Sequence, residues 1–89
     1  MIRSVKLNIY GQVQGVGFRY SALQKANEIG VCGFVKNRTD GSVYMEIEAE
    51  PELIEEFIYW CKHDPSWSRV DEVVVVDIPF NHYTNFGVK

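Results

Sequence analysis

The residues whose types and spacing could do chemistry lie in the run Gly11-Gln-Val-Gln-Gly15-Val-Gly17-Phe-Arg19. Three glycines placed this closely let the main chain adopt φ > 0 and approach a ligand. In such a loop several N–H groups can point at one anion. An arginine after the last glycine adds a planar, permanently charged group that suits phosphate oxygens. The run therefore predicts a phosphate-binding loop made of the Arg19 side chain and the main-chain amides of Gln14, Gly15, Val16, Gly17 and Phe18.

The glycine-rich run lies between a predicted strand and a predicted helix. Val5, Leu7 and Ile9 alternate with polar residues and indicate a strand over about 3–10. Apolar residues at helical spacing then indicate a helix over about 19–29, which Gly30 would end. A helix N-terminus carries partial positive charge, which adds to the affinity of such a loop for anions.

The rest of the chain shows the same kinds of signal. Thr39-Asp40-Gly41 is typical of a tight hairpin. Pro51 and the glutamates around it indicate the start of a second helix, which Pro65 would stop. Further strands are expected at about 31–36, 42–49, 70–78 and 85–89.

This order of elements predicts an α+β, ferredoxin-like βαββαβ fold in a single domain, residues 1–89. We expect an antiparallel sheet of four to five strands with two helices on one face. The helical crossover makes the first two strands parallel, so their carboxyl ends lie at the same end of the sheet. Asn37 should then lie beside the glycine-rich loop, although it comes eighteen positions after Arg19. Its amide can orient a water molecule but is too weak a base to deprotonate one.

Together with Gly33-Phe-Val-Lys-Asn37-Arg-Thr-Asp-Gly41, the glycine-rich run resembles the two signatures of the acylphosphatase family, and the resemblance covers nearly all of the 89 residues. It implies the same ferredoxin-like fold and a metal-independent enzyme. Such enzymes hydrolyse carboxylic–phosphoric mixed anhydrides to a carboxylate and inorganic phosphate. Arg19 would be the phosphate-binding arginine and Asn37 the water-positioning asparagine. Phe34, where the family often carries Trp, is a departure that affects packing more than catalysis.

The small set of candidate groups also favours an activated phosphate. An acyl phosphate expels a carboxylate whose conjugate acid has a pKa of about 4, so no general acid is required. A phosphate monoester is among the slowest of substrates to hydrolyse without help. The sequence offers no convincing nucleophilic cysteine, general-acid aspartate near the loop or metal-binding cluster.

Composition excludes several other classes of protein. A net charge of −3 and a pI near 5.3 argue against nucleic acid as a partner. No apolar run approaches the ~20 residues that span a bilayer, and no signal peptide opens the chain, so we expect a cytoplasmic protein without membrane contact. We also expect a monomer. Cys32 and Cys61 lack metal-ligand spacing and are expected to be unpaired thiols. Neither a metal nor another cofactor is expected.

Two alternatives remain open from the sequence. The chain could be an acylphosphatase-like regulatory domain that binds phosphate or carbamoyl phosphate without activity of its own. The segment Cys32-Gly-Phe-Val also bears a faint similarity to part of an RNA-recognition motif, although the aromatic series is incomplete. A ferredoxin-like RNA-binding module is therefore the second alternative.

Overall fold

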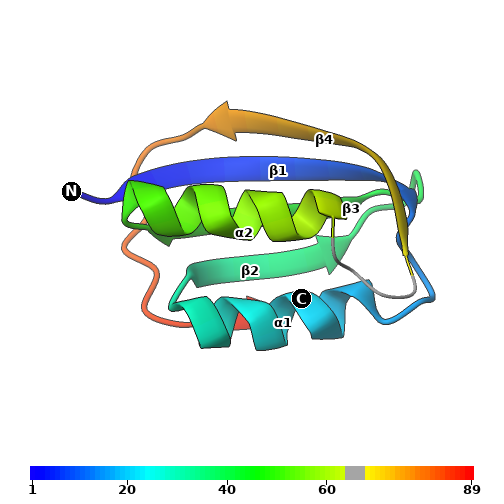
Figure 1. The fold of residues 1–89 in the computed structure, drawn as a ribbon, viewed down its shortest axis with the longest axis horizontal. Coiled ribbons are helices and arrows are strands. Elements are labelled where there is room, and N and C mark those ends of the chain that lie inside the picture. The colour runs from blue at the N-terminus through cyan, green and yellow to red at the C-terminus, as the bar shows by residue number, and fades with distance from the viewer. Residues whose placement is uncertain (64–67) are drawn as a thin grey trace.

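The computed structural model describes residues 1–63 and 68–89, and over these ranges the chain forms two helices and a five-stranded sheet (Figure 1). The elements, in chain order, are β1 (Arg3–Gln12), α1 (Phe18–Ile29), β2 (Cys32–Asn37), β3 (Val43–Ala49), α2 (Pro51–His63), β4 (Arg69–Asp77) and β5 (Phe86–Val88).

The sheet has the strand order β4-β1-β3-β2-β5. β1 and β2 are both antiparallel to β3, so they run parallel to each other on its two sides, as the helical crossover predicts. β5 pairs with β2 in the parallel direction. The sheet is therefore mixed, and the prediction of an antiparallel sheet is wrong at this edge. The reason is that the chain from β4 returns across the sheet, so that β5 starts at the same end as β2.

Both helices cover one face of the sheet and bury the alternating apolar residues of the central strands (Figure 1). Val5, Leu7 and Ile9 of β1 are fully buried. The apolar face of α2 is also buried, through Ile54, Phe57, Ile58 and Cys61. This arrangement confirms the ferredoxin-like α+β fold.

Most element boundaries differ from the sequence-based prediction by one or two residues. The largest difference is in β1, which continues to Gln12 through an irregularity between Tyr10 and Gly11. The predicted helix stop at Pro65 lies outside the described residues, and α2 is described to His63. Cys32 and Cys61 are free thiols. Within the described ranges, no helix is long and apolar enough to cross a membrane.

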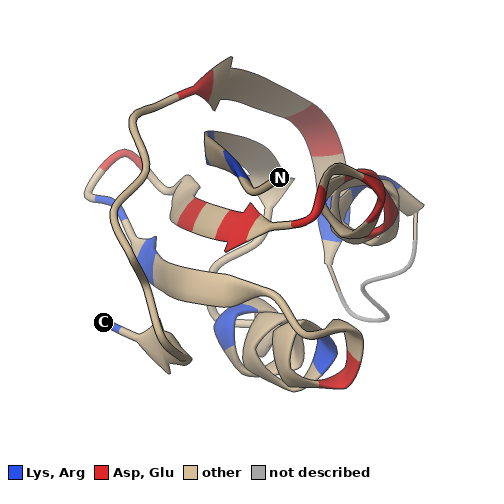
Figure 2. Cartoon of the chain, turned by 90° about the vertical axis from the view of Figure 1, so that its left-hand side faces the viewer, with Lys and Arg blue, Asp and Glu red and all other residues tan. Residues whose placement is uncertain are grey.

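The chain between β4 and β5 passes from one edge of the sheet to the other (Figure 2). It is fixed there by the buried carboxylate of Glu48, on the sheet face opposite to the helices. Glu48 accepts hydrogen bonds from the main-chain N–H of Asn81 and of Tyr83, the latter at 2.9 Å, and from the Ser4 hydroxyl at 2.9 Å. Because these bonds fix the approach to β5, they also determine where the last residues of the chain lie.

Candidate active site

The connection from β1 to α1 is a tight loop with two residues in the left-handed conformation. Gly15 has φ 75° and Gly17 has φ 78°, values that favour glycine because a Cβ is strained there. Gly17 is the N-cap of α1, and no side chain caps this helix end. Main-chain N–H groups at the start of a helix have no partner within it, so they remain suited to an anion.

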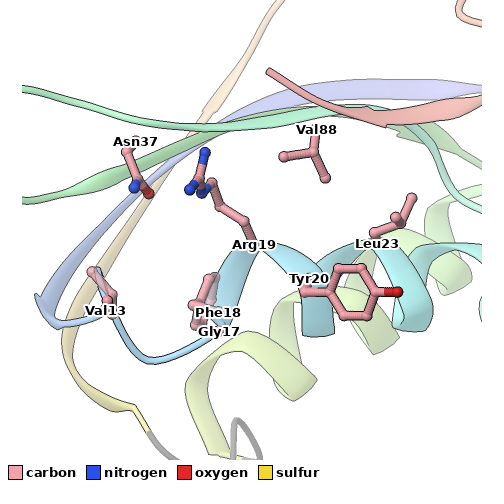
Figure 3. Close-up of a pocket in the computed structure, with 9 residues that line it drawn as sticks. Val13, Gly17, Phe18, Arg19, Tyr20, Leu23, Asn37 and Val88 are labelled. Atoms are coloured by element: carbon pink, nitrogen blue, oxygen red, sulfur yellow. The ribbon is translucent and has the colours of Figure 1, made fainter.

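The start of α1 is fixed by Phe18. Its side chain is 2% exposed, and its ring lies 5.9 Å from the ring of Trp60 on α2. Because this anchor is in the core, the main chain of the loop has a defined position relative to the sheet. The residue that follows, Arg19, is partly buried and extends over the loop (Figure 3).

Arg19 and Asn37 line the same pocket, a cavity of about 390 Å³ next to the loop. Figure 3 shows the Asn37 amide beside the Arg19 guanidinium, with Gly17 and Phe18 below. The topology therefore brings together the two side chains singled out from the sequence. The lining of this pocket consists of Val13, Gly15, Gly17, Phe18, Arg19, Tyr20, Leu23, Asn37 and Val88.

Gln14 and Val16, also predicted to bind phosphate through their amides, do not line the pocket. Val16 packs against the core. The Gln14 side chain is directed to the β2–β3 hairpin, where its Nε2 donates to the main-chain oxygens of Arg38 at 2.7 Å and Ser42 at 2.8 Å. No sequence signal indicated this contact, because a glutamine in a loop is compatible with many partners.

The Arg19 guanidinium keeps most of its hydrogen-bonding capacity. Its Nη1 donates a long, 3.4 Å hydrogen bond to the main-chain oxygen of Lys89. Among residues 1–63 and 68–89, no Asp or Glu side chain forms an ion pair with Arg19. A guanidinium has five donors, so several remain for the oxygens of an anion.

Asn37 has an unusual environment for a polar side chain. Its Oδ1 is buried and accepts no hydrogen bond from the described part of the chain. Leaving a buried acceptor unpaired costs about 1–3 kcal/mol, and native proteins keep few such groups. An acceptor in this state beside a cationic side chain is suited to orient a water molecule next to a bound anion.

The described residues contain no group of three or more His, Cys, Asp or Glu side chains that could bind a metal ion. The groups at this pocket that could bind or position a substrate are the loop, Arg19 and Asn37. These are hydrogen-bond donors and one orienting amide, a set that binds and positions but supplies no strong acid or base.

The family model for acylphosphatase matches residues 5–88. The chain belongs to the acylphosphatase family. An acylphosphatase from Mannheimia succiniciproducens is 48% identical over 80 residues, covering 90% of this chain and 87% of the relative. This confirms the resemblance seen in the two motifs.

Comparison with solved structures supports membership of this family. The crystal structure of an acylphosphatase from Bacillus subtilis superposes with a TM-score of 0.94 at 29% identity, covering 100% of this chain and 99% of that one. Full-length HypF in its phosphate- and nucleotide-bound form gives a TM-score of 0.90 at 34% identity, covering 100% of this chain but 12% of HypF. The acylphosphatase fold thus occurs in chains of this size and within a much larger protein.

Proposed function

We propose that this chain hydrolyses acyl phosphates to a carboxylate and inorganic phosphate, with Arg19 and Asn37 as its catalytic residues. The observation that carries the proposal is the buried, unpaired Oδ1 of Asn37 in the same pocket as the Arg19 guanidinium. The curated relative and the Bacillus subtilis structure, both acylphosphatases, support the reaction class.

In this proposal the terminal phosphoryl oxygens bind to Arg19 and to the main-chain amides of the loop residues that line the pocket, Gly15, Gly17 and Phe18. These donors are fixed before the substrate arrives, since Gly17 sets the loop conformation and Phe18 anchors its end in the core. Preorganised donors of this kind stabilise charge as it redistributes in phosphoryl transfer, because they need little rearrangement.

Asn37 orients the attacking water because its Oδ1 accepts a hydrogen bond from one O–H group of that water. The water oxygen forms the new bond to phosphorus while the bond from phosphorus to the acyl oxygen breaks, and the carboxylate leaves with the bonding electron pair. The proton of the water passes to a phosphoryl oxygen of the substrate, because an amide is too weak a base to take it. A carboxylate leaving group needs no general acid, since its conjugate acid has a pKa of about 4.

The local charge around the site supports an anionic substrate, although the chain has a net charge of −3. Figure 2 shows Lys and Arg on β2, in the β2–β3 hairpin and at the last residue, although the hairpin and α1 also carry acidic residues, and Asp and Glu are frequent on α2, β3 and β4. Lys36 and Arg38, which flank Asn37, place positive charge next to the site without making the whole chain basic.

The test is hydrolysis of benzoyl phosphate in the presence of EDTA. We expect metal-independent turnover by the wild type and a loss of about 10³–10⁵-fold in Arg19→Ala, the range seen for catalytic arginines. Asn37→Ala should lose most of the rate but retain affinity for inorganic phosphate, measured by calorimetry. Arg3→Ala and Asn27→Ala, which change the same residue types outside the pocket, are the matched controls. Near-wild-type activity of Arg19→Ala would refute the proposal.

We also infer that residues 1–89 act as a single-domain monomer in the cytoplasm, without nucleic acid or membrane partners. Two unpaired thiols suit a reducing compartment. The sheet face that an RNA-binding module would use carries the Glu46 carboxylate, hydrogen-bonded to the hydroxyls of Tyr44 and Tyr83, which disfavours a polyanion. Sedimentation analysis tests the monomer, and salt-dependent binding of RNA would contradict this inference.

A further inference from the structure

The pocket has a second side that the phosphoryl chemistry does not use. Val88 of β5 and Leu23 of α1 lie on the side of the Arg19 guanidinium away from Asn37, and Tyr20 borders the same region (Figure 3). All three side chains are apolar or aromatic. Arg19 is the charged residue of the lining, and it belongs to the phosphate end of the pocket.

The in-line geometry of phosphoryl transfer determines which part of the substrate lies on this side of the pocket. In phosphoryl transfer the attacking and leaving oxygens are roughly in line through phosphorus. If Asn37 orients the water, as proposed above, the acyl oxygen leaves on the opposite side of the phosphoryl group. That side is the one bordered by Val88, Leu23 and Tyr20.

We propose that Tyr20, Leu23 and Val88 form the acyl-binding surface of this enzyme and favour uncharged, apolar acyl groups, aromatic ones in particular. This inference rests on the proposed function, because the position of the leaving group follows from the roles of Arg19 and Asn37. An acyl group that carries a carboxylate would meet no partner of opposite charge beside these three side chains.

The exposure of the surface explains why an acyl group would bind there. Tyr20 is 66% exposed and Val88 is 42% exposed, so both present apolar area to solvent at the mouth of the pocket. Leu23 is partly buried and packs against the core, which fixes the floor between them. Covering exposed apolar area releases about 25 cal/mol per Å², so a larger apolar acyl group gains more than an acetyl group.

The test compares kcat/KM for benzoyl phosphate with kcat/KM for acetyl phosphate, two substrates that share the phosphoryl group. Tyr20→Ala and Val88→Ala should each lower the ratio of the first value to the second by about fivefold to tenfold, the effect of losing one or two apolar contacts. Tyr59→Ala is the matched control, because Tyr59 is 65% exposed on α2 and does not line this pocket. It should leave the ratio unchanged.

A charge placed on the same surface provides the converse test. Val88→Lys should raise kcat/KM for succinyl phosphate relative to benzoyl phosphate, since the new cation would meet the free carboxylate of the succinyl group. Unchanged ratios in Tyr20→Ala, Val88→Ala and Val88→Lys, with both substrates still hydrolysed, would overturn the acyl-binding surface alone. Absence of hydrolysis by the wild type would refute the proposed function as well.

Discussion

The side-chain amide of Gln14 donates a 2.8 Å hydrogen bond to the main-chain oxygen of Ser42, 28 positions later in the chain. Ser42 closes the β2–β3 hairpin, where Asp40 accepts hydrogen bonds from its main-chain N–H at 2.9 Å and from its hydroxyl at 2.6 Å. The hairpin begins directly after Asn37. Gln14 thus connects the loop that would bind phosphate to the strand end that would position water.

Gln14→Ala should therefore affect both stability and catalysis. It removes one donor from the main-chain oxygens of Arg38 and Ser42, which both keep a main-chain N–H donor. We therefore expect a loss of about 0.5–1.5 kcal/mol in the free energy of unfolding, the net value of a hydrogen bond whose acceptor stays paired. We also expect a lower kcat for benzoyl phosphate, because the loop and Asn37 lose their direct connection. Urea denaturation and steady-state kinetics measure the two effects. Gln24→Ala, at an exposed position of α1, is the control. An unchanged kcat in folded Gln14→Ala would show that the connection is only structural.

Two glycines with positive φ should respond differently to alanine. An added Cβ at Gly17 meets no atom within 4 Å, so Gly17→Ala should fold and lose about 1–2 kcal/mol through backbone strain alone. At Gly33 an added Cβ would lie 1.8 Å from the main-chain oxygen of Glu46. Such a clash would force β2 and β3 apart. Gly33→Ala should cost more than about 4 kcal/mol. Urea denaturation of both variants tests this order, and equal losses would contradict it.

Acid should destabilise the protein through Glu46. Burial alone would raise the pKa of this carboxyl, but hydrogen bonds from Tyr83 and Tyr44, with Lys89 and Lys6 nearby, lower it below its ordinary value of 4.5. Burial and the same hydrogen bond raise the pKa of Tyr44 to about 12, so its hydroxyl remains a donor. A carboxyl whose pKa is lower in the folded protein than in the unfolded chain contributes its full stabilisation at pH values above the unfolded-state pKa. This stabilisation is lost as the pH falls through the folded-state pKa.

Glu46→Gln should thus lose less stability than the wild type when the pH is lowered from about 7 to about 3. Urea denaturation at the two pH values measures the difference. Glu56→Gln changes an exposed glutamate on α2 and should keep the wild-type pH dependence. An equal dependence in Glu46→Gln and the wild type would assign the acid sensitivity to other carboxylates.

The two thiols should react at very different rates. Burial raises the pKa of the Cys61 thiol, and the thiolate is the reactive form. Cys32 is partly exposed. A thiol-specific disulfide reagent should modify one cysteine in the native protein and both after unfolding. Cys32→Ser should remove the native reaction, and a rapid reaction in that variant would show that Cys61 is accessible.

The sequence predicted those features that follow from local chemistry and from chain topology. The Asp40-Gly41 turn was recognisable because its residue types suit a hairpin, and Gly41 adopts φ 91°. The position of Asn37 beside the loop was predictable because a helical crossover makes two strands parallel. Neither feature depends on a contact between side chains that are distant in the sequence.

Features that depend on distant side chains were not predictable. The parallel β5 edge depends on Glu48, which alternation on β3 would place on an exposed face and which is instead 3% exposed. The extension of β1 to Gln12 requires close approach to β4, since a Cβ at Gly11 would lie 2.1 Å from the main-chain oxygen of Arg69. The apolar side of the pocket was not predictable, because the spacing of Leu23 within α1 suits a core residue equally well and Val88 comes from the unpredicted parallel pairing.

The central position of β1 has a consequence for the order in which the protein forms on the ribosome. β1 pairs with β3 on one side and with β4 on the other, and Val5 faces Asp77 across that second pairing. Arg19 and Asn37 are therefore synthesised well before Arg69–Asp77. Until β4 emerges, a nascent chain carries both groups yet leaves β1 as an unpaired edge, which is prone to pair with other chains. The residues that would perform the reaction are thus synthesised before the strand that covers the edge of β1 and protects the chain from aggregation.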